Sequence, residues 1–240
     1  AFLERLYLSC FNRYPDIEGM RFWTNRINTD PTCTGASVVE YFFMKDEFTN
    51  AGHSDEEYVR RLYTTIMNRQ ADAGGLQYWL GCLESGNSRY GVLRTFVRTE
   101  EFAAVCGTYG VATGSLAAKE NRDENLDVTA FVYRQYSEIL KRPGEVEGIN
   151  YWCGRIMHDN MSPHLLSESF VFSDEFIERD YNDEDFVKIL YRAFMGREFD
   201  QTGLNHWLSG LRNSSYSRMD VFNNFAGSSE FSNIVKSYGL

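Results

Sequence analysis

The chain spells one twelve-residue pattern four times. The copies read NRYPDIEGMRFW (residues 12–23), NRQADAGGLQYW (68–79), KRPGEVEGINYW (141–152) and GREFDQTGLNHW (196–207). Each copy places an acid three residues after an Arg, a Gly six residues after that Arg and a Trp ten residues after it. Self-similarity of this length indicates stacked copies of one supersecondary unit. The fold must therefore accommodate the same local structure four times.

A wider frame surrounds the dodecamer. A Tyr lies six residues before each Arg, and a Glu-Phe pair closes each copy. The Tyr residues are Tyr7, Tyr63, Tyr136 and Tyr191, and the closing acids are Glu47, Glu101, Glu175 and Glu230. Successive Arg residues are separated by 56, 73 and 55 positions, so the repeats form two pairs.

The spacing predicts two domains joined by a linker. We expect residues 1–112 to hold repeats at 1–48 and 54–112, and residues 128–240 to hold repeats at 128–176 and 182–240. Residues 113–127 (TGSLAAKENRDENLD) are polar and charged, as is typical of a linker.

Each repeat is expected to be helical. In YVRRLYTTIMNR (58–69) the apolar residues recur at steps of three and four, which predicts one face of a helix. Ser54 and Glu57 form a capping-box pattern ahead of it. A second helix should run from the acid through the Trp, and a third should end at Glu-Phe. The sequence thus predicts an all-α fold of four repeats of about 50–55 residues, with roughly three helices each.

The dodecamer is interpreted as a structural joint between the first two helices. The Arg suits the negative end of the first helix dipole, the acid caps the second helix, the Gly permits close approach and the Trp fills the space behind it. The joint residues are Arg13, Asp16, Gly19 and Trp23; Arg69, Asp72, Gly75 and Trp79; Arg142, Glu145, Gly148 and Trp152; and Arg197, Asp200, Gly203 and Trp207. Glu145 should be a poorer cap than Asp. All four Trp side chains are expected to be largely buried, so that Trp79→Ala costs roughly 3 to 5 kcal/mol.

These residues resemble a bacterial repeat family known only as domain of unknown function 4214. Its pattern of Leu-Tyr, Arg, Asp, Gly-Leu, Tyr-Trp, Ser-Arg and Glu-Phe is matched by the second repeat from Leu62 to Phe102. The fourth repeat departs at His206 and the third at Gln135, Pro143 and Glu145, while the first carries TCTGASVVEYFFMKDEF (32–48) in place of a short loop. The resemblance implies non-catalytic modules of secreted or cell-surface proteins, often beside enzymes or adhesins that act on polysaccharide, with a fold like that of phycobilisome linker domains.

Composition argues against several partner classes. The chain has 24 basic and 34 acidic residues and a net charge of −10, which disfavours nucleic acid. No apolar run approaches the roughly 18 to 20 residues that span a bilayer, so membrane insertion is not expected. The chain opens inside a helical pattern, which suggests a piece of a longer protein.

The five cysteines leave two interpretations open. Two short-range disulfides, Cys10–Cys33 and Cys82–Cys106, would suit a secreted protein, with Cys153 left over. Alternatively all five are buried thiols. No C-x-x-C pair is present and the histidines are not at ligand spacing, so neither zinc nor another metal is expected.

Catalytic motifs are missing from the sequence: it contains no H-E-x-x-H, no G-x-S-x-G and no phosphate-binding Gly-rich loop. We therefore expect no enzyme activity and no cofactor. An enzyme would need a polar cleft with converging carboxylates.

Aromatic residues in predicted loops are the best binding signals. Tyr14 and Phe199 follow their Arg, and Tyr90 and Tyr216 lie beside the Ser-Arg steps that contain Arg89 and Arg218. Such aromatics can stack on sugar rings or anchor a protein. We expect a carbohydrate-binding module, with a protein-interaction or spacer module as the alternative.

Overall fold

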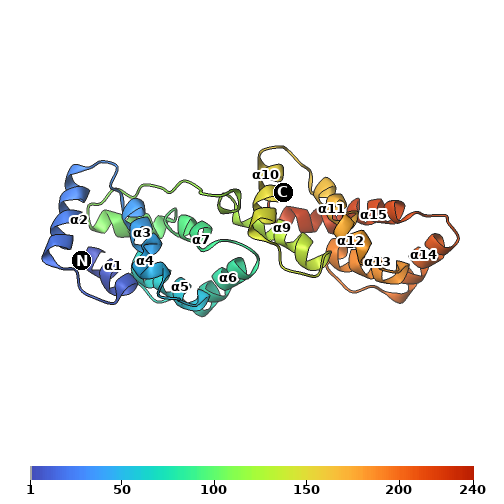
Figure 1. Ribbon diagram of the computed structural model, residues 1–240, viewed down its shortest axis with the longest axis horizontal. Helices are drawn as coiled ribbons and strands as arrows, with labels where there is room; N and C mark the ends of the chain where they lie inside the picture. The colour runs from blue at the N-terminus through green and yellow to red at the C-terminus, as the bar shows by residue number, and fades with distance from the viewer. Residues whose placement is uncertain (1) are drawn as a thin grey trace. The chain divides into compact units, whose positions relative to one another are not determined.

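The computed structural model describes residues 2–240, which form helices and no strands (Figure 1). These residues divide into two compact units, with the boundary between Lys119 and Glu120. Each unit contains two repeats. Within residues 2–240 no helix is both long and apolar enough to cross a membrane.

The first unit contains eight α-helices and one π-helical turn. Repeat 1 comprises α1 (Phe2–Phe11), α2 (Ile17–Thr29), α3 (Gly35–Met44) and α4 (Asp46–Thr49). Repeat 2 comprises α5 (Asp55–Leu62), the π turn η1 (Tyr63–Met67), α6 (Ala73–Glu84), α7 (Arg89–Phe96) and α8 (Glu100–Thr108).

The second unit follows the same order. It opens with the short 3₁₀ turn η2 (Asn121–Asp123). Repeat 3 then comprises α9 (Leu126–Glu138), α10 (Val146–Met157), α11 (Pro163–Val171) and α12 (Asp174–Glu178). Repeat 4 comprises α13 (Asp183–Leu190), the π turn η3 (Tyr191–Met195), α14 (Gln201–Arg212), α15 (Arg218–Ala226) and α16 (Ser229–Ser237). The prediction of an all-α fold is therefore confirmed.

Each repeat has four helices, so the expected helix end at Glu-Phe is wrong. The third helix stops earlier, and Glu-Phe lies in the first turn of a separate fourth helix. In repeat 2 the Thr99 side chain accepts a hydrogen bond from the backbone N–H of Phe102, and Ser173 and Ser228 do the same in repeats 3 and 4. Each of these capping residues is in the extended conformation and starts the fourth helix just after the third has ended.

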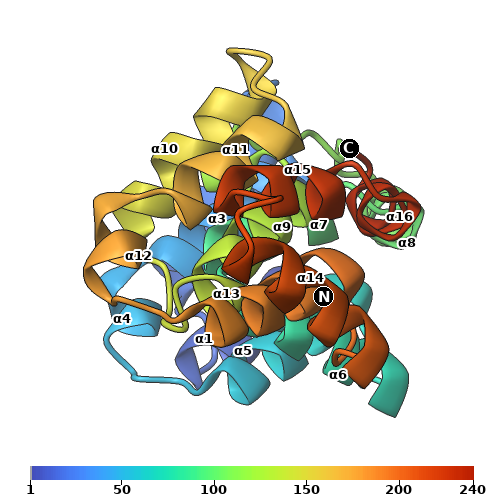
Figure 2. The same ribbon diagram turned by 90° about the vertical axis from the view of Figure 1, so that its right-hand side faces the viewer.

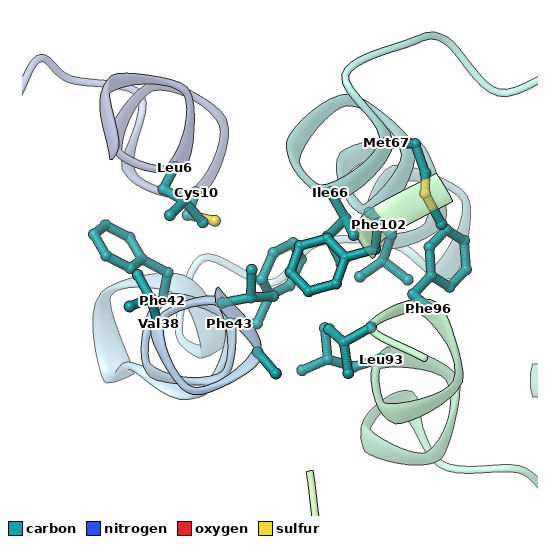
Figure 3. Close-up of a cluster of buried hydrophobic side chains, with 14 of the residues drawn as sticks. Leu6, Cys10, Val38, Phe42, Phe43, Ile66, Met67, Leu93, Phe96 and Phe102 are labelled. Atoms are coloured by element: carbon teal, nitrogen blue, oxygen red, sulfur yellow. The ribbon is translucent and has the colours of Figure 1, made fainter. Parts of the chain in front are cut away.

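The core of the first unit forms where helices of both repeats converge. Figure 3 shows Leu6 and Cys10 from α1 beside Phe42 and Phe43 from α3, with side chains of η1, α7 and α8 opposite. Phe43 and Phe102 are fully buried. Because each fully buried Phe contributes on the order of 1.5–3 kcal/mol, this shared core holds the two repeats together.

The second unit has an equivalent core. Helices α11 and α15, the third helices of its two repeats, lie side by side (Figure 1, Figure 2). Phe222 contacts Phe172 edge-to-face with ring centroids 5.5 Å apart. The two repeats of this unit therefore also share one core.

An arginine joins the repeats within each unit. Arg5 Nε of α1 donates to the carbonyl of Thr65 in η1 at 2.8 Å. Arg134 Nη2 of α9 donates to the carbonyls of Arg192 and Ala193 in η3 at 2.9 and 3.2 Å. The wider π turn does not use every carbonyl within the helix, so the arginine of the neighbouring repeat can bind there.

The segment expected to be a linker, residues 113–127, is divided at the boundary: residues 113–119 belong to the first unit and residues 120–127 to the second. Leu116 is buried in the first core and its carbonyl accepts a bond from Arg94 Nε at 3.0 Å. Beyond the boundary, Asn121 Nδ2 donates to the carbonyl of Asn150 at 3.0 Å. Each half of the segment is therefore hydrogen-bonded within its own unit.

Candidate functional site

The dodecamer forms the turn between the first and second helices. The residue before each Arg adopts a left-handed conformation, with φ of 51° to 63° at Asn12, Asn68, Lys141 and Gly196. Asp16 then accepts a bond from the backbone N–H of Gly19 at 2.6 Å, and the Asp of repeats 2 and 4 caps in the same way. Glu145 makes no such capping bond and instead pairs with Arg142 at 2.6 Å. The predicted caps are confirmed, as is the weaker cap in repeat 3.

The glycine of the dodecamer is required by the tyrosine of the frame. A Cβ added at Gly19, Gly75, Gly148 or Gly203 would overlap the hydroxyl of the Tyr in its own repeat. The first and second helices therefore meet at a distance that only glycine permits.

The repeated arginine has a main partner that sequence reasoning missed. It binds the Glu of Glu-Phe with both carboxylate oxygens in repeats 1 to 3, for example Arg69 to Glu101 at 2.6 and 3.1 Å. Its guanidinium also lies over the Tyr ring, 4.8 Å from the Tyr63 centroid. In repeat 4, Arg197 instead contacts Asp200 at 3.5 Å. The near-constant spacing from Arg to Glu was the available signal.

The four Trp residues are not equally buried. Trp23 is 4% exposed, whereas Trp79, Trp152 and Trp207 are half-buried against the core. Tyr41 covers Trp23, with ring centroids 4.8 Å apart. The corresponding positions of the other repeats hold the smaller residues Thr95, Ser169 and Asn224. All four Trp side chains thus pack on a core as expected, but Trp23 is buried more deeply than the other three.

The two arginines considered for binding are engaged within their own repeats. Arg89 donates to Asp55 and to the carbonyl of His53 at 2.8 and 2.7 Å. Arg218 donates to Asp183 and to the carbonyl of Tyr181 at 3.0 and 2.6 Å. Both therefore connect the start of the third helix to the start of the first.

The four frame-breaking aromatics have different environments. Tyr14 is 75% exposed, while Tyr90 is 8% exposed with its hydroxyl 2.9 Å from Glu40 Oε1. Tyr216 packs on Trp207 with centroids 5.7 Å apart. Phe199 is half-buried. The structure does not gather these rings into one aromatic face within either unit.

A groove between α2 and α3 is the strongest candidate site in the first unit. Its volume is about 410 Å³, and its lining residues are Trp23, Arg26, Cys33, Ser37, Glu40, Tyr41, Met44 and Lys45. We call it the Tyr41 groove, because Tyr41 is 43% exposed and presents an aromatic ring there. A larger depression of about 820 Å³ is lined by α2 alone and is an open helix face.

Polar groups surround the exposed ring. Lys45 Nζ lies 5.3 Å from the Tyr41 centroid. Glu40 accepts bonds from Tyr90 and pairs with Lys119 at 2.9 Å. Sequence reasoning missed this groove, although Tyr41 is the only aromatic among the four equivalent positions of the frame.

A second groove involves one of the predicted residues. Phe199 lines a depression of about 480 Å³ between α13 and α14, together with polar residues such as Gln201, Asn205 and Arg212. Lys188 Nζ lies 5.1 Å from the Phe199 centroid. We call it the Phe199 groove.

The cysteines are free thiols in the structure, so the bonds Cys10–Cys33 and Cys82–Cys106 are not formed. Cys10 lies near Arg61 and Thr65, while Cys106 lies against Gly35. Burial raises the pKa of Cys10 to about 12 and that of Cys106 to about 11. These thiols are therefore protonated at neutral pH and fill core space.

Across residues 2–240, no group of three His, Cys, Asp or Glu side chains is arranged to hold a metal ion. The chain is an all-α protein built from tandem repeats paired into two compact units. The family model described as Domain of unknown function (DUF4214) matches residues 39–106 and 167–235, which is more than half of the chain. The chain therefore belongs to this family. No curated protein matches it.

Proposed function

We propose that this chain is a non-catalytic, carbohydrate-binding module of a secreted or cell-surface bacterial protein, and that the Tyr41 groove is its main sugar site. The proposal depends chiefly on one observation: an exposed Tyr ring lies in a groove whose rim is polar. The family resemblance in sequence points to the same class of protein.

The chemistry of the groove suits a sugar. A pyranose ring has an apolar face that can stack on Tyr41, and hydroxyl edges that need donors and acceptors. Arg26, Ser37 and Lys45 supply donors, while Glu40 supplies an acceptor. The volume of about 410 Å³ is within the usual range for small-ligand sites.

Glu40 has the properties of a binding carboxylate rather than a catalytic acid. It accepts a hydrogen bond from the Tyr90 hydroxyl and pairs with Lys119, both at 2.9 Å. Most glycosidases need two carboxyl groups flanking the scissile bond. Among the residues that line the Tyr41 groove, Glu40 is the one carboxylate. This supports binding without hydrolysis.

A second function, protein interaction, is favoured by another repeated feature. The residue directly before the Trp is an exposed aromatic in three repeats: Phe22, Tyr78 and Tyr151. Tyr78 contacts Trp79 edge-to-face with centroids 5.0 Å apart, and Phe22 and Tyr151 contact their Trp similarly. Rigid exposed aromatics of this kind are common anchors for protein partners.

Glycan-array screening followed by affinity gel electrophoresis tests the proposal. We expect Tyr41→Ala to weaken binding at least about tenfold. Stacking of a sugar ring on the Tyr41 ring, together with the removal of water from both surfaces, contributes roughly 1.4 kcal/mol or more. Tyr78→Ala is the matched control, because Tyr78 is 58% exposed, lies beside a Trp and is outside the groove. Phe199→Ala tests the Phe199 groove in the same assay.

The two functions give different results. Absence of binding to plant, bacterial and host glycans by the wild-type chain would refute the carbohydrate proposal. Recovery of a stoichiometric protein partner that Tyr78→Ala loses and Tyr41→Ala retains would establish protein interaction instead.

A further inference from the structure

We infer that the Tyr41 groove selects sugars that carry an acid group, such as a uronate carboxylate or a sulfate. This inference rests on the proposed function and specifies its ligand class. It is drawn from the charges around the groove and from the position of one lysine.

The residues that line the groove carry more positive than negative charge. Arg26 and Lys45 are cationic, and Glu40 is the one anionic residue of the lining. Glu40 is already paired with Lys119 at 2.9 Å, a residue outside the lining. The lining therefore carries two cations against one carboxylate; Lys119 pairs closely with Glu40, while Asp30, also outside the lining, contacts Arg26 at the longer distance of 3.4 Å.

Arg26 retains capacity for a ligand. Its contact with Asp30 is a single long one, Nε to Oδ2 at 3.4 Å. The Asp30 carboxylate is held mainly by Thr32, whose hydroxyl donates to Oδ1 at 2.5 Å and whose backbone N–H donates to the same oxygen at 2.9 Å. A guanidinium presents five N–H donors, so most of those on Arg26 remain available to an anion.

Lys45 lies where a sugar would stack on Tyr41. Its ammonium lies over the Tyr41 ring, 5.3 Å from the centroid, on a side chain long enough to move. Its acidic neighbours are Asp46 and Glu47, and Glu47 is bound by Arg13 at 2.9 Å. The Lys45 ammonium can therefore move from the Tyr41 ring to an anionic group of a ligand.

A sugar that stacks on Tyr41 from this side must displace Lys45. A neutral sugar replaces the cation–π contact with a hydrogen bond to a hydroxyl. An acidic sugar replaces it with a charge-assisted hydrogen bond, which is roughly twice as strong. The displacement therefore favours an acidic ligand over a neutral ligand of the same shape.

The charge of the whole chain makes this selectivity measurable. The net charge of −10 repels an anionic polymer, so binding has to come from a local cationic site. Added salt screens both effects. If the groove cations dominate, affinity for an acidic glycan falls as salt rises; if only the net charge acts, affinity rises.

The experiment compares matched polymers by affinity gel electrophoresis and isothermal titration calorimetry on the full chain. The probes are polygalacturonate, the same polymer after its carboxyl groups are reduced to alcohols, and a sulfated galactan. We expect polygalacturonate, the sulfated galactan or both to bind more tightly than the reduced polymer. This preference should decrease between 50 mM and 500 mM NaCl, because the Debye length falls from roughly 14 Å to roughly 4 Å. The two acidic probes distinguish a carboxylate from a sulfate.

Lys45→Gln is the decisive variant. We expect it to reduce affinity for the acidic probe about threefold to fivefold, as for an exposed ion pair, and to reduce affinity for the reduced polymer by a smaller factor. Lys236→Gln makes the same charge change on the exposed surface of α16 and should have no effect.

The outcomes separate the two proposals. Equal affinity for the acidic and reduced polymers, or equal losses for both in Lys45→Gln, would overturn the acidic-sugar inference while leaving carbohydrate binding intact. Binding to no glycan at all would overturn both.

Discussion

Replacing Gly75 by alanine should destabilise the first unit, although alanine is the better helix former. A Cβ at this position overlaps the Tyr63 hydroxyl and lies 3.2 Å from Asp72 Oδ2. Tyr63 cannot easily move away, because it is buried and its ring contacts Phe96 edge-to-face at 5.2 Å. Overpacking of this kind costs about 1–3 kcal/mol. The gain in helix propensity offsets about 1 kcal/mol, which leaves a net loss of up to about 2 kcal/mol.

The same helix supplies the control. Gly81 lies in the interior of α6, is exposed, and has no atom within 4 Å of an added Cβ. Gly81→Ala should therefore stabilise by about 0.5–1 kcal/mol through helix propensity alone. The two Gly→Ala substitutions on one helix are thus expected to have opposite signs.

Urea unfolding followed by circular dichroism measures both variants. The double variant Gly75→Ala with Tyr63→Phe removes the clashing oxygen and should recover most of the lost stability, which a double-mutant cycle would show as coupling. If Gly75→Ala is as stable as Gly81→Ala, the glycine is not required by the tyrosine and the reasoning about the joint is refuted.

Three further predictions follow from burial and charge. Trp23→Ala should cost about 3–5 kcal/mol in chemical denaturation, while the half-buried Trp79 should cost less when truncated, about 2–3 kcal/mol; equal losses would contradict the difference in burial. The bidentate Arg142 bond, with help from Arg179, lowers the pKa of Glu175 from 4.5 to about 2, so the stabilisation is complete above pH 4.5 and is lost as pH falls toward 2. The stability difference between wild type and Glu175→Gln should shrink across that window, and a constant difference would exclude the ion pair as its cause. Iodoacetamide should label the half-buried Cys82 of the native protein before the other cysteines, as read by mass spectrometry, and a loss of two mass units per bond would reveal disulfides instead.

Local features of the fold were predictable because they depend on residues close in sequence. Asp72 caps α6 through an amide three residues away, and Asn68 before Arg69 supplies the left-handed turn. The separate fourth helix was missed because the apolar pattern continues across the break. Helix α7 ends at Phe96 and Thr99 caps the start of α8, so the capping signal is only one residue long.

The candidate site was only partly predictable. Phe199 does line a groove, but Tyr90 turns inward to Glu40 and Ala117, and Arg89 binds Asp55. Exposure depends on which side chains from other helices are within reach, and sequence spacing along one helix does not contain that information. Tyr41 could have been found from the sequence as the aromatic that replaces Thr95 in the frame.

The sequence by itself determined the fourfold repeat, its grouping into pairs, its helical character and the family to which the chain belongs. These properties come from hydrophobic periodicity and capping, which act over a few residues. Only the tertiary structure decided that Arg69 binds Glu101, that Tyr41 packs on Trp23, and that Tyr41 and Lys45 line a groove. Each of these depends on the distance between helices, which the packing of the shared core sets and no local pattern encodes.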